Sequence, residues 1–174
     1  MPSAAPFQFA SIELPDAEAL DQFCEKNGFP TRWGTEMLTA GCGAIVAKST
    51  DDQIIAMAWS TIAAFYVDEI RLTVKPPAEC PYLFGDFVAP AHRGKGLQSA
   101  LVRERLTQHA GKPAFALIHP TNLASVRSYE SHGFRLAATL HVRYWGFLTG
   151  TRRITPVNGF TGNLRGKELA IATP

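Results

Sequence analysis

Long apolar runs are missing from this chain of 174 residues, although 46% of its residues are hydrophobic. No stretch approaches the roughly 18 consecutive apolar residues that span a bilayer, and residues 1–11 lack the basic start of a signal peptide. We therefore expect a soluble, cytoplasmic protein with no membrane partner. The length suits one well-filled core and is short for two ordinary domains, so a single domain over 1–174 is expected.

Cysteine is scarce as well. The chain has three cysteines, Cys24, Cys42 and Cys80. They lie far apart in the sequence, their number is odd, and no two of them form a Cys-x-x-Cys pair. This pattern argues against both a disulfide framework and a zinc site. We therefore expect three reduced thiols and no bound metal.

Acidic residues are rare in the second half of the chain. Residues 87–174 contain three Asp and Glu against twelve Lys and Arg, whereas residues 1–86 contain twelve against five. The two halves thus carry net charges of +9 and −7. This asymmetry indicates an anionic ligand for the second half and suggests a cationic one for the first, although folding can also interleave two ordinary solvated faces.

Periodicity and turn residues predict a chain in which strands and helices alternate. Strands are expected over 7–12, 44–48, 54–59, 82–88, 115–118 and 134–145, the last pairing with 151–157. Helices are expected over 15–27, 31–38, 97–110 and 122–129. We expect 61–74 to extend the sheet. Residues 158–174 are basic and are expected as a possible, loosely packed tail.

The most informative motif is the turn Ala91-His92-Arg93-Gly94-Lys95-Gly96-Leu97-Gln98, which joins an expected strand to an expected helix. Two glycines flank a lysine where the backbone must bend, and the turn leads straight into the helix. Free backbone amides and the positive end of the helix dipole then point at one spot, which suits a diphosphate. Arg93 and Lys95 add cationic side chains.

Two other phosphate-binding motifs do not fit this turn. A Walker A loop needs Ser or Thr directly after Gly94-Lys95 and a glycine where this chain has Ala89. A dinucleotide-binding fingerprint needs a third glycine where this chain has Ser99, and an acid at the end of the next strand. What remains is Arg93-x-x-Gly96-x-Gln98 after an extended strand.

That pattern resembles the acyl-CoA-binding signature of the GNAT superfamily of N-acyltransferases, in which Arg or Gln, two residues, Gly and one residue precede Gly or Ala. Gln98 departs from the small residue expected there. Downstream, the segment from Asn122 through Tyr129 to Gly133-Phe134 resembles the family's Asn, small residue, Tyr, Gly-Phe segment at the same spacings. The resemblance implies an α/β (α+β) GNAT fold, with a mixed central sheet of about six to seven strands, helices on both faces and a splayed parallel strand pair.

By the same resemblance, the chain binds acetyl-CoA. The main-chain groups of Phe87 and Val88 would bind pantetheine and the acyl carbonyl at the splay, like an oxyanion-hole donor. Asn122 would also bind the cofactor, although an Asn at a helix start is equally an ordinary N-cap. The pyrophosphate would be held mainly by backbone amides of the turn, which comprises Arg93, Gly94, Lys95, Gly96, Leu97, Gln98 and Ser99.

The same resemblance implies that Tyr129 is the general acid, which would protonate the departing thiolate. A phenol with a pKa near 10 can donate to a sulfur with a pKa near 8.5 without being ionised at rest. The alternative is an aromatic residue at the rim of the core.

The general base has several candidates. Some family members carry a glutamate five positions before the Asn, where this chain has Leu117. Asp86 is the best substitute, because it lies on the same face of its strand as Val88; the alternative is a strand-edge carboxylate satisfied by backbone or arginine. Other candidates are Glu69, His119, His141 and a water chain without a dedicated base.

The sequence therefore predicts an N-acetyltransferase that moves an acetyl group from acetyl-CoA to a primary amine of a small molecule or peptide by direct attack. Three cysteines without an activating partner disfavour a covalent acyl-enzyme. A non-catalytic acyl-CoA-binding regulatory module on the same fold and a transferase of longer acyl chains stay open as alternatives. No nucleic acid is expected as a partner, because Arg152-Arg153 and 165–167 lack interleaved stacking aromatics, and a homodimer is a possible assembly.

Overall fold

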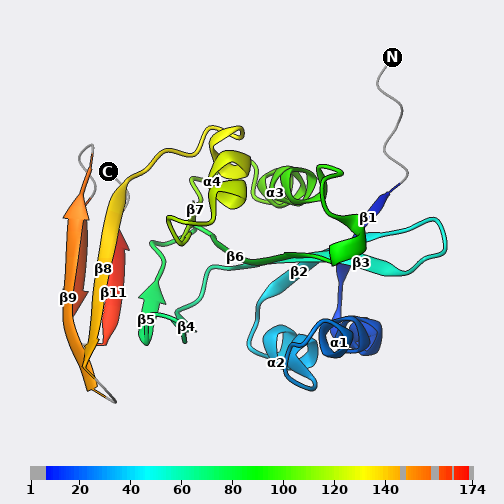
Figure 1. Ribbon diagram of the computed structural model, residues 1–174, viewed down its shortest axis with the longest axis horizontal. Helices are drawn as coiled ribbons and strands as arrows, with labels where there is room; N and C mark the ends of the chain where they lie inside the picture. Colours follow the sequence, from blue (N-terminus) through cyan, green and yellow to red (C-terminus); the bar gives the residue numbers. More distant parts are fainter. Residues whose placement is uncertain (1–6, 146–147, 158–160, 166, 173–174) are drawn as a thin grey trace.

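The computed structural model of the chain describes residues 7–145, 148–157, 161–165 and 167–172, so the other positions, including part of the expected tail, lie outside the described residues. Figure 1 shows a central sheet covered by helices, with further strands of the C-terminal part at one side. Among the described residues, no helix is both long and apolar enough to cross a membrane.

A five-stranded mixed sheet forms the centre, in the order β1-β2-β3-β6-β7. Its strands are β1 (Gln8–Ile12), β2 (Gly43–Lys48), β3 (Ile54–Thr61), β6 (Tyr82–Val88) and β7 (Phe115–Ala116). The first four pair antiparallel, whereas β6 and β7 run parallel. The predicted fold class is confirmed, although this sheet contains five strands rather than the expected six or seven.

Helices cover both faces of this sheet, as expected (Figure 1). A 3-10 turn (Leu14–Asp16), α1 (Ala17–Lys26) and α2 (Trp33–Thr39) lie on one face. The opposite face carries α3 (Leu97–Gln108) and α4 (Leu123–Glu130). The expected helix boundaries are correct to within about two residues.

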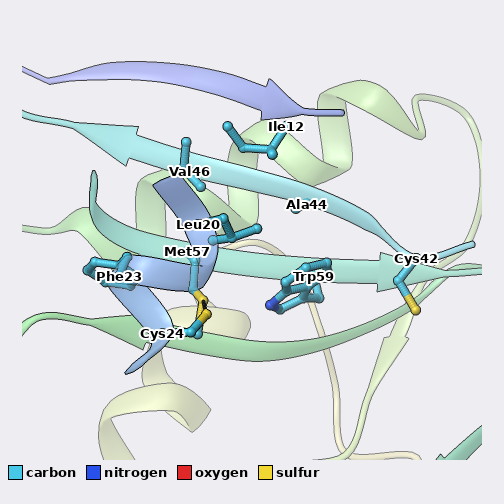
Figure 2. Close-up of a cluster of buried hydrophobic side chains, with 9 residues drawn as sticks. All are labelled: Ile12, Leu20, Phe23, Cys24, Cys42, Ala44, Val46, Met57 and Trp59. Carbon is cyan, nitrogen blue, oxygen red and sulfur yellow. Dashed lines mark hydrogen bonds between the residues drawn. The ribbon is translucent and has the colours of Figure 1, made fainter. Parts of the chain in front are cut away.

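The alternation of side chains along β3 shows how the sheet is buried on both sides. Met57 and Trp59 pack with Leu20 of α1 in one hydrophobic cluster (Figure 2). Ala56 and Ala58 belong to a second cluster, which includes side chains of α3. Two covered faces explain why this strand reads as one continuous apolar run rather than an alternating one.

A second sheet has the order β10-β11-β5-β4 and contains four strands. They are β4 (Phe65–Val67), β5 (Leu72–Lys75), β10 (Thr161–Arg165) and β11 (Glu168–Ala172). The expectation that 61–74 extends the central sheet is therefore wrong beyond the end of β3, because this segment turns away to pair with the C-terminal strands.

The described residues of 158–174 form β10 and β11 instead of a loosely packed tail. β11 runs parallel to β5, and Leu169 is buried against Leu72 and Val74. The short stretch 168–172 pairs antiparallel with β10 along its whole length and joins a sheet because β5, from a distant part of the chain, pairs with its other edge.

The expected hairpin near the C-terminus is confirmed. β8 (Ala138–Trp145) pairs antiparallel with β9 (Leu148–Pro156). Leu140 and Ile154 pack against the buried cluster of the second sheet, so one face of the hairpin covers that sheet at one side of the molecule (Figure 1).

β6 contains a bulge that directs one carboxylate toward α3. The ladder to β3 shifts register between Met57 and Trp59, where β6 has one residue more than its partner. Gly85 adopts a φ of +62° at this point, and a Cβ there would lie 2.7 Å from Cδ1 of Trp59. The neighbouring Asp86 therefore faces α3, on the same side of the sheet as Val88.

We predict that Gly85→Ala lowers the free energy of unfolding by about 3 kcal/mol, because it combines left-handed strain with overpacking against Trp59. Gly28→Ala is the matched control: its φ is +85°, but a Cβ there meets nothing within 4 Å, so a loss of about 1 kcal/mol is expected. Urea unfolding measures both. Equal losses in the two variants would contradict the close approach at Gly85.

Candidate active site

The glycine-rich turn forms a helix N-terminus that is open to an anion. After a 3-10 turn (Pro90–His92), Arg93 is extended, and both Gly94 and Gly96 adopt positive φ, at +74° and +76°. Gly96 is the N-cap of α3, and the amide of Ala100 donates to the Gly96 carbonyl at 3.0 Å. The amides of residues 97–99 precede that bond, so they are the orphan donors that an anion at a helix N-terminus can use.

Side chains of the turn are engaged with neighbouring elements. Arg93 donates from Nε to the Val88 carbonyl at 3.1 Å, which ties the turn to the end of β6. Gln98 donates to Ser125 Oγ at 2.7 Å, and Ser99 Oγ lies 2.9 Å from a ring nitrogen of His132. These contacts fix α3 against α4, so a phosphate would be met mainly by backbone amides and by the exposed Lys95.

The parallel pair opens directly beside this turn. Pairing of β6 with β7 covers Tyr82↔Phe115 and Leu83↔Ala116, whereas β6 stays paired with β3 as far as Val88. The second half of β6 therefore extends past the end of the β7 ladder. This is the splay that was expected, and it leaves the second half of β6 beyond the part that pairs with β7.

The side chains of Phe87 and Val88 are partly buried and pack against the two core clusters of the central sheet. Phe87 packs edge-on against Phe29, with ring centroids 5.1 Å apart, and Val88 packs on the cluster that includes Leu97. Only their main-chain groups are therefore suited to a role in binding.

Asp86 and Tyr129, named independently as acid–base candidates, lie in direct contact. The Tyr129 hydroxyl donates to Asp86 Oδ2 at 2.9 Å. Tyr129 is only 4% exposed, and the Asp86 side chain is 9% exposed. The two residues come from β6 and α4.

Arg105 completes this cluster, and it was missed by the sequence analysis. Its Nη2 lies 2.6 Å from Asp86 Oδ1 and donates to the Tyr129 hydroxyl at 3.1 Å. The missed signal is its spacing: Leu97, Leu101 and Arg105 follow at intervals of four and share one buried face of α3. A charge in line with two apolar residues predicts a buried ion pair.

The surroundings raise the pKa of both acid–base candidates, Asp86 and Tyr129. Burial raises the pKa of the Asp86 carboxyl, against the opposing effects of Arg105 and of hydrogen bonds from Tyr129 and Gln98. Burial, together with the charge of Asp86, also raises the pKa of the Tyr129 phenol, and Arg105 opposes this shift. A raised pKa suits a carboxylate that must accept a proton, and a phenol that stays protonated at neutral pH can serve as a donor.

Asn122 occupies the N-cap of α4, where its side-chain oxygen accepts a hydrogen bond from the Ser125 amide at 3.2 Å. The capping role that was one of its two interpretations is therefore present. The residue is exposed at the start of the helix that carries Tyr129, so a second role toward a ligand stays a proposal.

The other base candidates lie in ordinary surroundings. His119 lies in the turn before α4, with Nδ1 2.8 Å from Thr121 Oγ1. His141 is exposed on β8, and Glu69 is exposed in the turn between β4 and β5. Asp86 is thus the candidate that the fold brings to Tyr129.

Comparison with known proteins gives a family. The sequence model of the acetyltransferase (GNAT) family matches residues 10–134, which include both motifs, the turn and the Asn122 to Phe134 segment. No curated protein sequence matches the chain at a significant level.

Several solved structures share the fold. The ribosomal-protein-alanine N-acetyltransferase of Brucella melitensis is 15% identical with a TM-score of 0.57, covering 80% of this chain and 99% of its own. The Arabidopsis thaliana NAA60 complex with acetyl-CoA is 17% identical with a TM-score of 0.54, covering 74% and 84%. The aminoglycoside N-acetyltransferase AAC(6')-Iy, in complex with CoA, is 20% identical with a TM-score of 0.56, covering 83% and 97%.

We predict that acetyl-CoA raises the melting temperature of the protein and that Gly96→Glu abolishes this rise, because the carboxylate would occupy and repel the pyrophosphate position. Gly111→Glu is the matched control, since Gly111 has a similar φ of +79° and open surroundings beyond the other end of α3. A ligand-induced shift that survives in folded Gly96→Glu would contradict the placement.

Proposed function

This chain belongs to the acetyltransferase (GNAT) family, and on that premise we propose that it transfers an acetyl group from acetyl-CoA to a primary amine of a small molecule or peptide. The observation that carries the proposal is the coincidence of three features: the glycine-capped start of α3, the opening between β6 and β7, and the contact between Asp86 and Tyr129. We further propose that residues 1–174 form one acetyltransferase domain.

In the proposed complex, the pyrophosphate of acetyl-CoA meets the backbone amides from Gly94 to Ser99, with Lys95 adding positive charge. The pantetheine arm enters the opening between β6 and β7, where Asn122 contributes a polar contact from the start of α4. The acyl carbonyl accepts a hydrogen bond from the main chain near Phe87 and Val88, which stabilises negative charge on oxygen in the transition state.

The proposed chemistry is direct attack by the amine on the thioester. Asp86 removes a proton from the amine, and Tyr129 donates its proton to the sulfur as the carbon–sulfur bond breaks. The buried cysteines are not suited to a covalent intermediate, because burial raises the thiol pKa of Cys42 and Cys80 and, with two nearby acids, that of Cys24 to about 12.

The acceptor we propose is a small cationic amine. Residues 1–86 carry a net charge of −7, and such a field concentrates an ammonium ion near the site. An ammonium cannot attack a thioester, so the site must both attract the charge and remove the proton, which is the role given to Asp86.

Tyr129→Phe keeps the ring packed against Phe134 and removes one hydroxyl. We predict that turnover falls by about 10²-fold while acetyl-CoA still binds, because a general acid is lost and the cofactor contacts remain. Thiol release and calorimetric titration measure the two quantities. Turnover within about twofold of wild type would leave Tyr129 with a packing role only.

Asp86→Asn tests the base in a screen of primary amines with thiol release followed across pH. If Asp86 is the base, the variant is slowest at low pH and recovers as bulk solvent deprotonates the amine, whereas loss of attraction alone raises KM. Repeating the screen at two salt concentrations identifies attraction, because salt screens it. Glu69→Gln is the matched control at a rival carboxylate.

Because Asp86→Asn leaves Arg105 without its ion-pair partner, its fold must be confirmed first by the acetyl-CoA-induced melting shift. A pH profile identical to wild type in the folded variant would contradict the assignment of Asp86. A preference for neutral or anionic acceptors would contradict the proposed acceptor class.

A further inference from the structure

Arg105 is a fully buried charge beside the two candidate acid–base residues. Its exposed fraction is 0%, and it lies one helical turn after Leu101 on α3. A guanidinium does not lose its proton in a protein, so its burial costs free energy unless it is paired and hydrogen-bonded. A leucine in this row would pack without that cost, which points to a role beyond packing.

The guanidinium joins four elements of the fold. Nη1 donates to the carbonyl oxygens of Trp59 at 2.9 Å and Phe84 at 3.4 Å, and Nε donates to the Leu101 carbonyl at 3.4 Å. Nη2 contacts the Tyr129 hydroxyl and the Asp86 carboxylate, at 3.1 and 2.6 Å. Strands β3 and β6 and helices α3 and α4 therefore meet at one side chain.

Three of these contacts lie at the bulge between β3 and β6. Trp59 and Phe84 are the paired residues at one side of the register shift, and Asp86 follows within the bulge. The same guanidinium thus fixes both β6 at its bulge and the carboxylate of Asp86 that projects from β6.

The charges explain what this contact does for proton transfer. When Tyr129 gives its proton to the thiolate, a phenolate forms 2.9 Å from Asp86 Oδ2. By then Asp86 carries the proton taken from the amine, so without Arg105 the phenolate would be a buried anion with no positive partner, which is strongly disfavoured. With Arg105 hydrogen-bonded to the phenol oxygen and beside the Asp86 carboxyl group, the net charge of the three side chains passes from +1 to zero as the phenolate forms.

We propose that Arg105 is the positioning residue of this reaction: it holds Asp86 and Tyr129 at the bulge and makes proton donation by Tyr129 feasible. The inference rests on the proposed acyl transfer with Tyr129 as the acid. The amine nitrogen bonds to the carbonyl carbon, the carbon–sulfur bond breaks with its electron pair on sulfur, and Tyr129 protonates that sulfur. Asp86 accepts the proton that the amine loses and returns it to the phenolate through their hydrogen bond.

A double-mutant cycle tests this role. In wild type, Tyr129→Phe is expected to lower kcat by about 10²-fold; in an Arg105→Gln background it is expected to lower kcat less than about threefold, because the acid is already ineffective there. Arg103→Gln is the matched control: its side chain is 63% exposed on the same helix, and the full effect of Tyr129→Phe should persist. Arg105→Lys, which keeps the charge, should recover at least about tenfold over Arg105→Gln.

A merely structural Arg105 predicts a different result. Tyr129→Phe would then cost the same factor in the Arg105→Gln and wild-type backgrounds, and that outcome would overturn the inference while leaving the proposed function intact. A wild-type protein that binds acetyl-CoA but releases no thiol with any amine would instead overturn the proposed function, and this inference with it.

If Arg105→Gln does not fold, the cycle moves to the Asp86→Asn background. Asp86→Asn with Arg105→Gln removes both charges together, so no buried charge is left unpaired. Tyr129→Phe should retain its effect in Asp86→Asn alone, where Arg105 is present, and lose it in the double variant. Equal effects in these two backgrounds would again overturn the role of Arg105.

Discussion

The ion pair between Arg105 and Asp86 connects the fold of this protein to its proposed chemistry. Arg105 is buried completely, and its guanidinium satisfies two strand carbonyls, one carboxylate and one phenol. Removing either charge would leave the other unpaired in the interior, a change that commonly costs about 3–5 kcal/mol. The geometry of the site and the stability of the core are therefore set by the same contact.

Around this contact, three local irregularities shape the proposed binding site. Gly85 allows β6 to bulge against Trp59, the β7 ladder ends at Leu83↔Ala116, and Gly96 starts α3 with its amides free for an anion. The three irregularities lie within one strand–turn–helix unit. A long anionic cofactor can therefore meet the turn with its phosphates and the strand opening with its thioester.

The sequence predicts the local parts of this arrangement well. Local sequence preferences determine the glycine turns and the start of α3. They also determine which strand carries Asp86 and which helix carries Tyr129. The contact between these two side chains, and its completion by Arg105, depends on how β6, α3 and α4 pack, so it could be inferred only from the unusual charge in the row of Leu97 and Leu101. The pairing of β11 with β5 is equally non-local, so the place of the β10–β11 hairpin in the second sheet could not be predicted from residues 158–174 alone.

The most direct measurement is a crystal structure of the protein with acetyl-CoA. The account predicts pyrophosphate oxygens within about 3.2 Å of amides between Gly94 and Ser99. It also predicts the thioester sulfur within about 4 Å of the Tyr129 hydroxyl, with Arg105 still bound to Asp86. Acetyl-CoA bound elsewhere, or with its thioester separated from Tyr129 by more than about 8 Å, would contradict it.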